Sequence, residues 1–227
     1  MRVLPRYSPM LASTGPITGT MEDWAFEPKL DGWRALVYVD GSLMVRTRND
    51  GDITSSVPEL SPLANALTGH HVVLDGELVA QQGRPFDFYR LGPRLAARNT
   101  VAVTRGQQRT SISFVAFDLL QLGSDDLTGL PYVARRARLD ELNLIGSAWC
   151  TVSSFPGAGP DVMAACVELG LEGVVAKRLS SIYRPGARSK DWVKVKCPEW
   201  RAVHGPLRHE SRDARAATGE RRASRPR

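Results

Sequence analysis

Lysine is scarce in this chain, and the positions of its lysines point to nucleophilic chemistry. The sequence contains 25 arginines but only five lysines, which are Lys29, Lys177, Lys190, Lys194 and Lys196. An arginine stays protonated in proteins, whereas a lysine amine can lose its proton and attack an electrophile. We therefore expect some of these lysines to perform a task that arginine cannot.

The first candidate nucleophile is Lys29, in the stretch EPKLDGWR. Pro28 restricts the backbone before it, and Asp31-Gly32 is typical of a tight turn after it. We expect the amine to lie at a sheet edge and to point into a cleft, where a cation such as Arg34 would favour its neutral, nucleophilic form. The same residues also suit an ordinary surface turn, so this stretch alone does not decide.

Carboxylates that could bind a metal or a ribose occur in two further stretches. In LDGELV, Asp75 and Glu77 are two residues apart and share one face of a strand. Such a buried pair needs partners, and its oxygens suit a ribose hydroxyl or a divalent metal. Glu172 opens the apolar stretch EGVVAKR, where it could reach a metal. A solvated turn at Glu77 and a strand-edge salt bridge at Glu172 and Lys177 are the alternatives.

A phosphate site is indicated by DWVKVK, in which Lys194 and Lys196 project from one face of a strand. Two parallel ammonium groups suit a phosphate, although lysines also protect the solvated face of an edge strand. The sequence has no GxxxxGK or GxGxxG motif, so side chains would hold any phosphate. The three cysteines have no CxxC spacing, which argues against zinc and favours a reducing cytoplasm.

The elements that must position these residues indicate an α+β fold. We expect strands toward the end of 24–39, with a hairpin at 40–41, and at 71–80, 111–122, 172–178 and 191–196. Helices are expected at 58–67, 86–98, 131–142 and 161–170, with a break or kink at Gly92-Pro93. Because strands and helices do not alternate regularly, the sheets should be mainly antiparallel.

The net charge of +6 lies mainly at the end of the chain. Residues 201–227 contain eight arginines and three acidic residues, which leaves about +1 for residues 1–200. We expect residues 1–200 to form one domain and residues 201–227 to be a disordered, Arg-rich tail that either binds phosphate loosely or has no partner. No apolar run is long enough for a membrane span or a signal peptide, so no membrane association is expected.

Six stretches in order carry a family resemblance: EPKLDGWR, RTRND, LDGELV, FVAFDLL, EGVVAK and DWVKVK. Together they resemble the covalent nucleotidyltransferases, which comprise ATP-dependent DNA ligases, RNA ligases and mRNA capping enzymes. LDGELV, AFDLL and YRPGARSKDWVKVK look most like bacterial repair-type DNA ligases, over residues 8–197. The resemblance implies an ATP-grasp-like nucleotidyltransferase domain in which mainly antiparallel sheets enclose a nucleotide cleft.

The resemblance also implies roles for nine residues and for the cofactors ATP and Mg²⁺ or Mn²⁺. Lys29 would take AMP from ATP and pass it to the 5′-phosphate of nicked duplex DNA. The other roles would be adenine contact by Glu27, adenine stacking by Phe117, ribose or phosphate contact by Arg34 and Arg48, ribose and metal contact by Glu77, metal binding by Glu172, and α-phosphate neutralisation by Lys194 and Lys196. Phe117 by itself is more typical of a core aromatic.

One departure from the resemblance concerns the end of the chain. In such ligases an OB-fold domain follows the lysine pair, but 30 residues after Cys197 are too few for a five-stranded barrel. The sequence therefore predicts that the OB-fold domain is absent and that a separate protein could supply its function. An RNA ligase-like adenylyltransferase, and a ligase core that binds nucleotide or DNA without complete nick sealing, remain alternatives.

Overall fold

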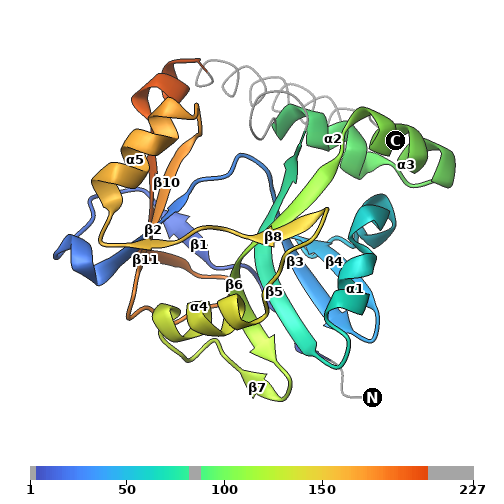
Figure 1. Ribbon diagram of the computed structural model, residues 1–227, viewed down its shortest axis with the longest axis horizontal. Coiled ribbons are helices and arrows are strands. Elements are labelled where there is room, and N and C mark those ends of the chain that lie inside the picture. Colours follow the sequence, from blue (N-terminus) through green and yellow to red (C-terminus); the bar gives the residue numbers. More distant parts are fainter. Residues whose placement is uncertain (1–3, 82–87, 204–227) are drawn as a thin grey trace, which may run out of the picture.

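Two β-sheets form the centre of the protein in the computed structural model, which describes residues 4–81 and 88–203. Figure 1 shows the first sheet on the left and the second on the right. The first sheet has the strand order β1 (Leu11–Ser13), β11 (Arg188–Lys196), β10 (Gly173–Arg178), β2 (Trp24–Pro28) and β9 (Phe155–Pro156). The second has the order β4 (Leu43–Thr47), β3 (Trp33–Asp40), β5 (His71–Ala80), β6 (Ile112–Leu122) and β7 (Asp125–Asp126), and β8 (Trp149–Thr151) also pairs with β6.

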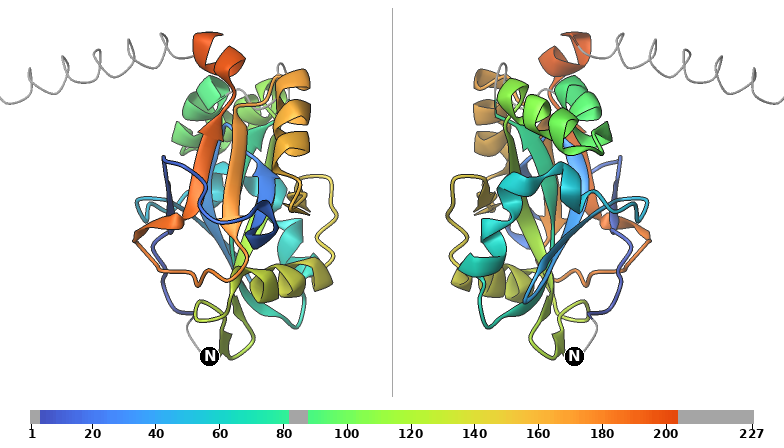
Figure 2. Two further views of the ribbon diagram at one scale, coloured as in Figure 1. Left: turned by 90° about the vertical axis from the view of Figure 1, so that its left-hand side faces the viewer. Right: turned by 90° about the vertical axis from the view of Figure 1, so that its right-hand side faces the viewer.

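Helices cover the outer faces of both sheets (Figures 1 and 2). Helix α5 packs on β2 and β10 of the first sheet, whereas α2 contacts β5 and α4 contacts β6 of the second. The helices are α1 (Pro62–Ala66), α2 (Phe88–Ala96), α3 (Thr100–Arg109), α4 (Tyr132–Glu141) and α5 (Gly159–Glu168). Three short 3₁₀ segments are η1 (Met21–Asp23), η2 (Thr54–Ser56) and η3 (Pro58–Leu60).

Three apolar clusters hold these layers together, because the central strands are buried on both faces. On β3, Ala35 and Val37 point to the cluster beneath the helices of the second sheet, whereas Leu36 and Tyr38 point to the cluster that also holds Trp192 of the first sheet. A third cluster lies beneath α5. The cluster that contains Leu36, Tyr38 and Trp192 lies between the two sheets and therefore sets their spacing.

The predicted α+β class and the mainly antiparallel pairing are confirmed. Within the described residues, only β1 with β11 and β6 with β8 pair in parallel. The predicted run over 24–39 is two strands in different sheets, β2 and β3, joined by residues 29–32. The segment predicted at 58–67 is η3 followed by α1, and the helix predicted at 161–170 is α5, which begins at Gly159.

Two helical segments differ from the prediction. Helix α2 is continuous through Pro93, because Leu91 and Leu95 are buried in the core and hold the helix in place. Helix α3 was not predicted, since its sequence is polar and only Val103 is buried. Residues 198–203 are helical. Residues 204–227, which hold most of the predicted Arg-rich tail, lie outside the described residues. None of the described helices is both long and apolar enough to cross a membrane.

Candidate active site

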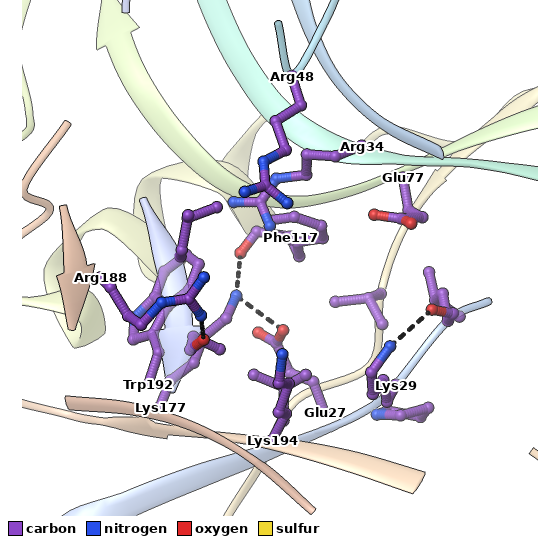
Figure 3. Close-up of a pocket in the computed structure, with 16 residues that line it drawn as sticks. Glu27, Lys29, Arg34, Arg48, Glu77, Phe117, Lys177, Arg188, Trp192 and Lys194 are labelled. Atoms are coloured by element: carbon purple, nitrogen blue, oxygen red, sulfur yellow. Dashed lines mark hydrogen bonds and ion pairs between the residues drawn. The ribbon is translucent and has the colours of Figure 1, made fainter. Parts of the chain in front are cut away.

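Lys29 lies where the chain crosses from the first sheet to the second, between β2 and β3. Its backbone N–H donates to the carbonyl of Gly173 at 2.7 Å, which anchors it to the start of β10. Three residues later the chain passes so close to β5 that a Cβ on Gly32 would stand 2.2 Å from the carbonyl oxygen of Leu78. The predicted turn therefore requires glycine at position 32, and it directs the Lys29 side chain into the pocket in Figure 3.

The amine of Lys29 is held by Glu172, which is 143 residues away in sequence. Lys29 Nζ donates to Glu172 Oε2 at 2.6 Å, and Lys196 Nζ lies 2.6 Å from Glu172 Oε1. Burial of Glu172 opposes its ionisation, but the two ammonium groups lower its pKa below the ordinary value. The carboxylate is thus ionised, and it links the candidate nucleophile to one of the two predicted phosphate-binding lysines.

Arg34 lines the same pocket but is not the cation that contacts Lys29. Its guanidinium forms a two-pronged ion pair with Asp75, at 2.5 and 2.6 Å, and lies 4.3 Å from the centre of the Phe117 ring. The hydroxyl of Tyr183 also donates to Asp75, at 2.6 Å. This network uses Asp75 to hold Arg34 rather than to bind a ligand.

Glu77 lines the pocket, whereas Asp75, two residues earlier on β5, is fully buried beneath it. The carboxylate of Glu77 accepts no hydrogen bond within the described residues. Burial raises the pKa of Glu77 from 4.5 to about 7, although Arg34 and Lys29 counteract part of this effect. Near neutral pH the group is therefore divided between its acid and carboxylate forms. A carboxylate in this state gains from a nearby cation.

Lys177 is a pocket residue that the sequence did not identify as a site residue. Its side chain is 2% exposed, and its ammonium lies 2.7 Å from Glu27 Oε2 and donates to the Phe117 carbonyl at 2.9 Å. The same ammonium lies 4.4 Å from the ring centres of both Phe117 and Trp192. In the sequence, only the low number of lysines marked Lys177 as unusual. Its burial could not be predicted, because it depends on strands that are distant in sequence.

The predicted adenine contacts, Glu27 and Phe117, line the same pocket and are linked by the Lys177 ammonium (Figure 3). Glu27 is 3% exposed and is also held by a hydrogen bond from the hydroxyl of Tyr132 on α4. Phe117 is 9% exposed, and Trp192 packs against it edge-on with ring centres 6.2 Å apart. An aromatic ring beside a fixed donor and acceptor suits a planar heterocyclic base.

Three further cations line the pocket: Arg48 and Lys194, which the sequence identified, and Arg188, which it did not. Arg188 donates to the Ala12 carbonyl at 2.6 Å, and burial together with the neighbouring Lys29 and Arg188 lowers the pKa of Lys194. Within the described residues, no ion pair joins any of the three to a carboxylate. These side chains are therefore available for phosphate oxygens.

The two lysines of β11 have different surroundings, although they project from one face as predicted. Lys194 stands opposite Val175 and lines the pocket, whereas Lys196 stands opposite Gly173 and pairs with Glu172. The pocket thus brings Lys29, Glu27, Arg34, Arg48, Glu77, Phe117 and Lys194 together, and Glu172 and Lys196 adjoin it through Lys29.

A preformed metal cage is not part of this site, since the described residues contain no group of three or more His, Cys, Asp or Glu side chains arranged to hold a metal. Glu172 has both oxygens against lysines, so Glu77 is the carboxylate more open to a cation. Mg²⁺ commonly uses one or two carboxylates together with substrate phosphates and water. These residues fit a divalent cation that arrives with a bound phosphate.

Proteins with similar sequences and folds include DNA ligases. The family described as ATP dependent DNA ligase domain matches residues 9–196. The multifunctional non-homologous end joining DNA repair protein LigD of Mycobacterium tuberculosis is 39% identical over 195 residues, which cover 83% of this chain and 24% of that protein. DNA ligase C of the same species is 34% identical over 194 residues, which cover 82% of this chain and 53% of that protein.

The structural comparison agrees with these matches. The solved structure of mycobacterial DNA ligase D complexed with ATP and MES aligns with a TM-score of 0.69 and 37% identity, covering 84% of this chain and 60% of that one. The chain spans about a quarter of the LigD sequence and about half of DNA ligase C. The predicted nucleotidyltransferase fold is confirmed, and the chain belongs to the ATP-dependent DNA ligase domain family.

Proposed function

We propose that this chain carries out the adenylation step of an ATP-dependent DNA ligase, with Lys29 as the nucleophile. The observation that carries the proposal is the position of the Lys29 amine. It lies in a pocket with unpaired cations and an aromatic ring, and Glu172 holds it at 2.6 Å. Lys29 Nζ would form a bond to the α-phosphorus of ATP while the bond from that phosphorus to the pyrophosphate oxygen breaks.

The Lys29 ammonium must lose one proton before it can attack. Glu172 Oε2 contacts the ammonium and positions it, but this ion pair favours the charged amine, so the contact must break as the proton leaves. Lys196, on the other oxygen of Glu172, keeps this carboxylate oriented. The pair Glu172 and Lys196 therefore positions the nucleophile, in addition to any contact that either residue makes with the nucleotide.

The remaining pocket residues would position ATP. Arg48, Arg188 and Lys194 would bind the phosphates and the departing pyrophosphate, since they have no competing carboxylate among the described residues. A divalent cation, Mg²⁺ or Mn²⁺, would be held by Glu77 and would supply further charge neutralisation on the phosphates. Glu27, an acceptor, and Lys177, a donor, match the amino group and ring nitrogen along one edge of adenine.

The second part of the proposal concerns the acceptor of AMP. We propose transfer to the 5′-phosphate of nicked duplex DNA in strand repair, because LigD and DNA ligase C are among the relatives matched over most of the chain. We also propose that the reaction takes place in the cytoplasm. The described residues contain no five-stranded barrel besides the two sheets. Two variants belong to the same proposal: a partner protein that supplies a DNA-clamping barrel, and adenylation without complete sealing.

The first experiment measures the covalent adduct directly. Incubation with α-labelled ATP and Mg²⁺ should label the protein with AMP that survives denaturation and is released by acid. Lys29→Ala should abolish labelling, and Lys29→Arg should abolish it too because guanidinium stays protonated. Lys190→Ala is the matched control, since Lys190 is exposed and does not line the pocket. Labelling that persists in Lys29→Ala would refute the assignment.

The second experiment identifies the polymer. Purified Lys29-AMP protein would be mixed, without free ATP, with 5′-phosphorylated nicks in DNA or in RNA. Transfer of AMP to the DNA end is expected. Faster transfer to RNA would favour the RNA ligase-like alternative, and transfer without strand joining would identify a ligase core that needs a partner.

A further inference from the structure

The helix pair α2 and α3 is rich in arginine and lacks acidic residues. Between residues 88 and 110 the sequence has no Asp or Glu and five arginines, which are Arg90, Arg94, Arg98, Arg105 and Arg109. The described residues as a whole contain 21 lysines and arginines and 20 acidic residues. Outside this helix pair, the described part of the chain therefore has a net negative charge.

One of the five arginines fixes the helix pair to the body of the protein. Arg94 is 2% exposed, and its guanidinium donates to both carboxylate oxygens of Glu59 at 2.7 Å. It runs beneath α3 so closely that a Cβ on Gly106 would stand 2.9 Å from its side chain. With Leu91 and Leu95 in the core, this contact gives the two helices a fixed orientation.

The other side of the helix pair presents arginines to solvent. Arg98, Arg105 and Arg109 are exposed, and no ion pair joins them to an acid within the part of the chain that the structure describes. Arg105 and Arg109 are one turn apart on α3 and so share a face. We call Arg98, Arg105 and Arg109 the α2–α3 arginine face.

This face lies at the same end of the molecule as the Lys29 crossover. The crossover touches β5 at Leu78, two residues before that strand ends, and α2 follows β5 in the chain and packs against it. Figure 1 shows α2 and α3 at the upper right, beside the upper end of β5. A polymer that reached Lys29 at this end could therefore also contact α3.

We propose that the α2–α3 arginine face binds the phosphate backbone of duplex DNA. This inference rests on the proposed function, because it assumes that the polymer presented to Lys29 is DNA. Arg98 is held in place by hydrogen bonds from its guanidinium to the Leu95 carbonyl at 2.6 Å and to Ser56 Oγ at 3.1 Å, whereas no such contact holds Arg105 or Arg109 within the described residues. Two exposed guanidinium groups one helical turn apart, beside a fixed third, match neighbouring backbone phosphates, and arginine suits phosphate better than a generic charge does. The face provides a contact outside the nucleotide pocket on a protein whose remaining described surface is net acidic.

The test removes two charges that have no structural contact in the described residues. Arg105→Gln/Arg109→Gln is compared with Arg6→Gln/Arg138→Gln, which removes the same charge at positions outside the helix pair, and with Arg105→Lys/Arg109→Lys, which keeps the charge. Affinity for a nicked duplex is measured from 0.05 to about 0.3 M salt, where each lost phosphate contact lowers the log–log slope by about 0.9. A loss of about 1.8 in slope corresponds to roughly 60-fold weaker binding at 0.1 M salt.

The expected result is this loss in the Gln pair, with most of the affinity restored in the Lys pair and kept in the control pair. Self-adenylation with ATP should be unchanged in all three, because none of these residues lines the pocket. Three results would overturn the inference: an unchanged salt-dependence slope in the Gln pair, a loss of slope in the control pair as large as in the Gln pair, or displacement of the nicked duplex by polyglutamate as effectively as by unlabelled DNA. If the unmodified protein formed no AMP adduct, the proposed function would be refuted instead. The DNA-binding measurement would still report on the arginine face.

Discussion

The substitution Glu77→Gln should stabilise the nucleotide-free protein at alkaline pH and leave its stability almost unchanged at acidic pH. Burial raises the pKa of Glu77 from 4.5 to about 7. The folded protein therefore binds the carboxyl proton more tightly than the unfolded chain does. Stability from this group is fully present below pH 4.5 and is lost as the pH rises through about 7. Glutamine mimics the protonated form and cannot lose that proton.

The size of the effect follows from the two pKa values. Each tenfold change in proton affinity is worth about 1.4 kcal/mol, so the change from 4.5 to about 7 corresponds to a ceiling of about 3 kcal/mol. Glu77 lines a pocket and keeps part of its hydration, which reduces the penalty to about 2 kcal/mol at pH 8. In a domain of this size that free energy corresponds to roughly 4–8 °C in melting temperature.

Urea unfolding at pH 5 and pH 8 measures this difference in the free energy of unfolding. Glu141→Gln, on the exposed end of α4, is the control, and it should change stability equally at the two pH values. ATP with Mg²⁺ should stabilise the unmodified protein more than Glu77→Gln, because the bound cation relieves the same penalty. A Glu77→Gln effect that is equal at pH 5 and pH 8 would refute the account of Glu77 as a carboxylate lacking a counter-charge.

Two further substitutions test how the site is positioned. Gly32→Ala places a methyl group 2.2 Å from the carbonyl oxygen of Leu78, so we expect the free energy of unfolding to fall by about 2–3 kcal/mol. The yield of the AMP adduct should fall as well, because the crossover positions Lys29. A full adduct yield would show that the crossover tolerates movement. Tyr183→Phe removes a hydrogen bond to buried Asp75 and leaves the buried backbone N–H of Met10 unpaired, so we expect the free energy of unfolding to fall by about 3 kcal/mol. Tyr7→Phe, which removes one hydrogen bond to Gln121, is the control and should lower it by about 1 kcal/mol. Equal losses in denaturant unfolding would contradict the role given to the Arg34 network.

Much of the fold could be predicted from the sequence, because hydrophobic patterning reports which faces of an element are buried. The strands at 71–80, 111–122 and 172–178 were predicted within one residue of β5, β6 and β10. Helix α3 was not predicted, since few of its residues are apolar and its stability comes from packing on α2 through Gly106. The local pattern of apolar residues cannot predict a contact between two helices.

The sequence by itself determined which residue types were available for chemistry and in what order they occur. A lysine between Pro28 and a tight turn, a carboxylate pair on one strand face and two lysines on another are local patterns that depend only on residue type and spacing. The six stretches in order were enough to identify the family, and the roles assigned to the individual residues stay predictions.

Only the tertiary structure decided which of these groups meet. Glu172 lies between Lys29 and Lys196 because β2, β10 and β11 are neighbours in one sheet, and the same register buries Lys177 against Glu27. Strand order and register are set by side-chain packing across the whole domain, which no short stretch encodes. The position of the Lys29 amine is therefore a property of the sheet rather than of its own motif.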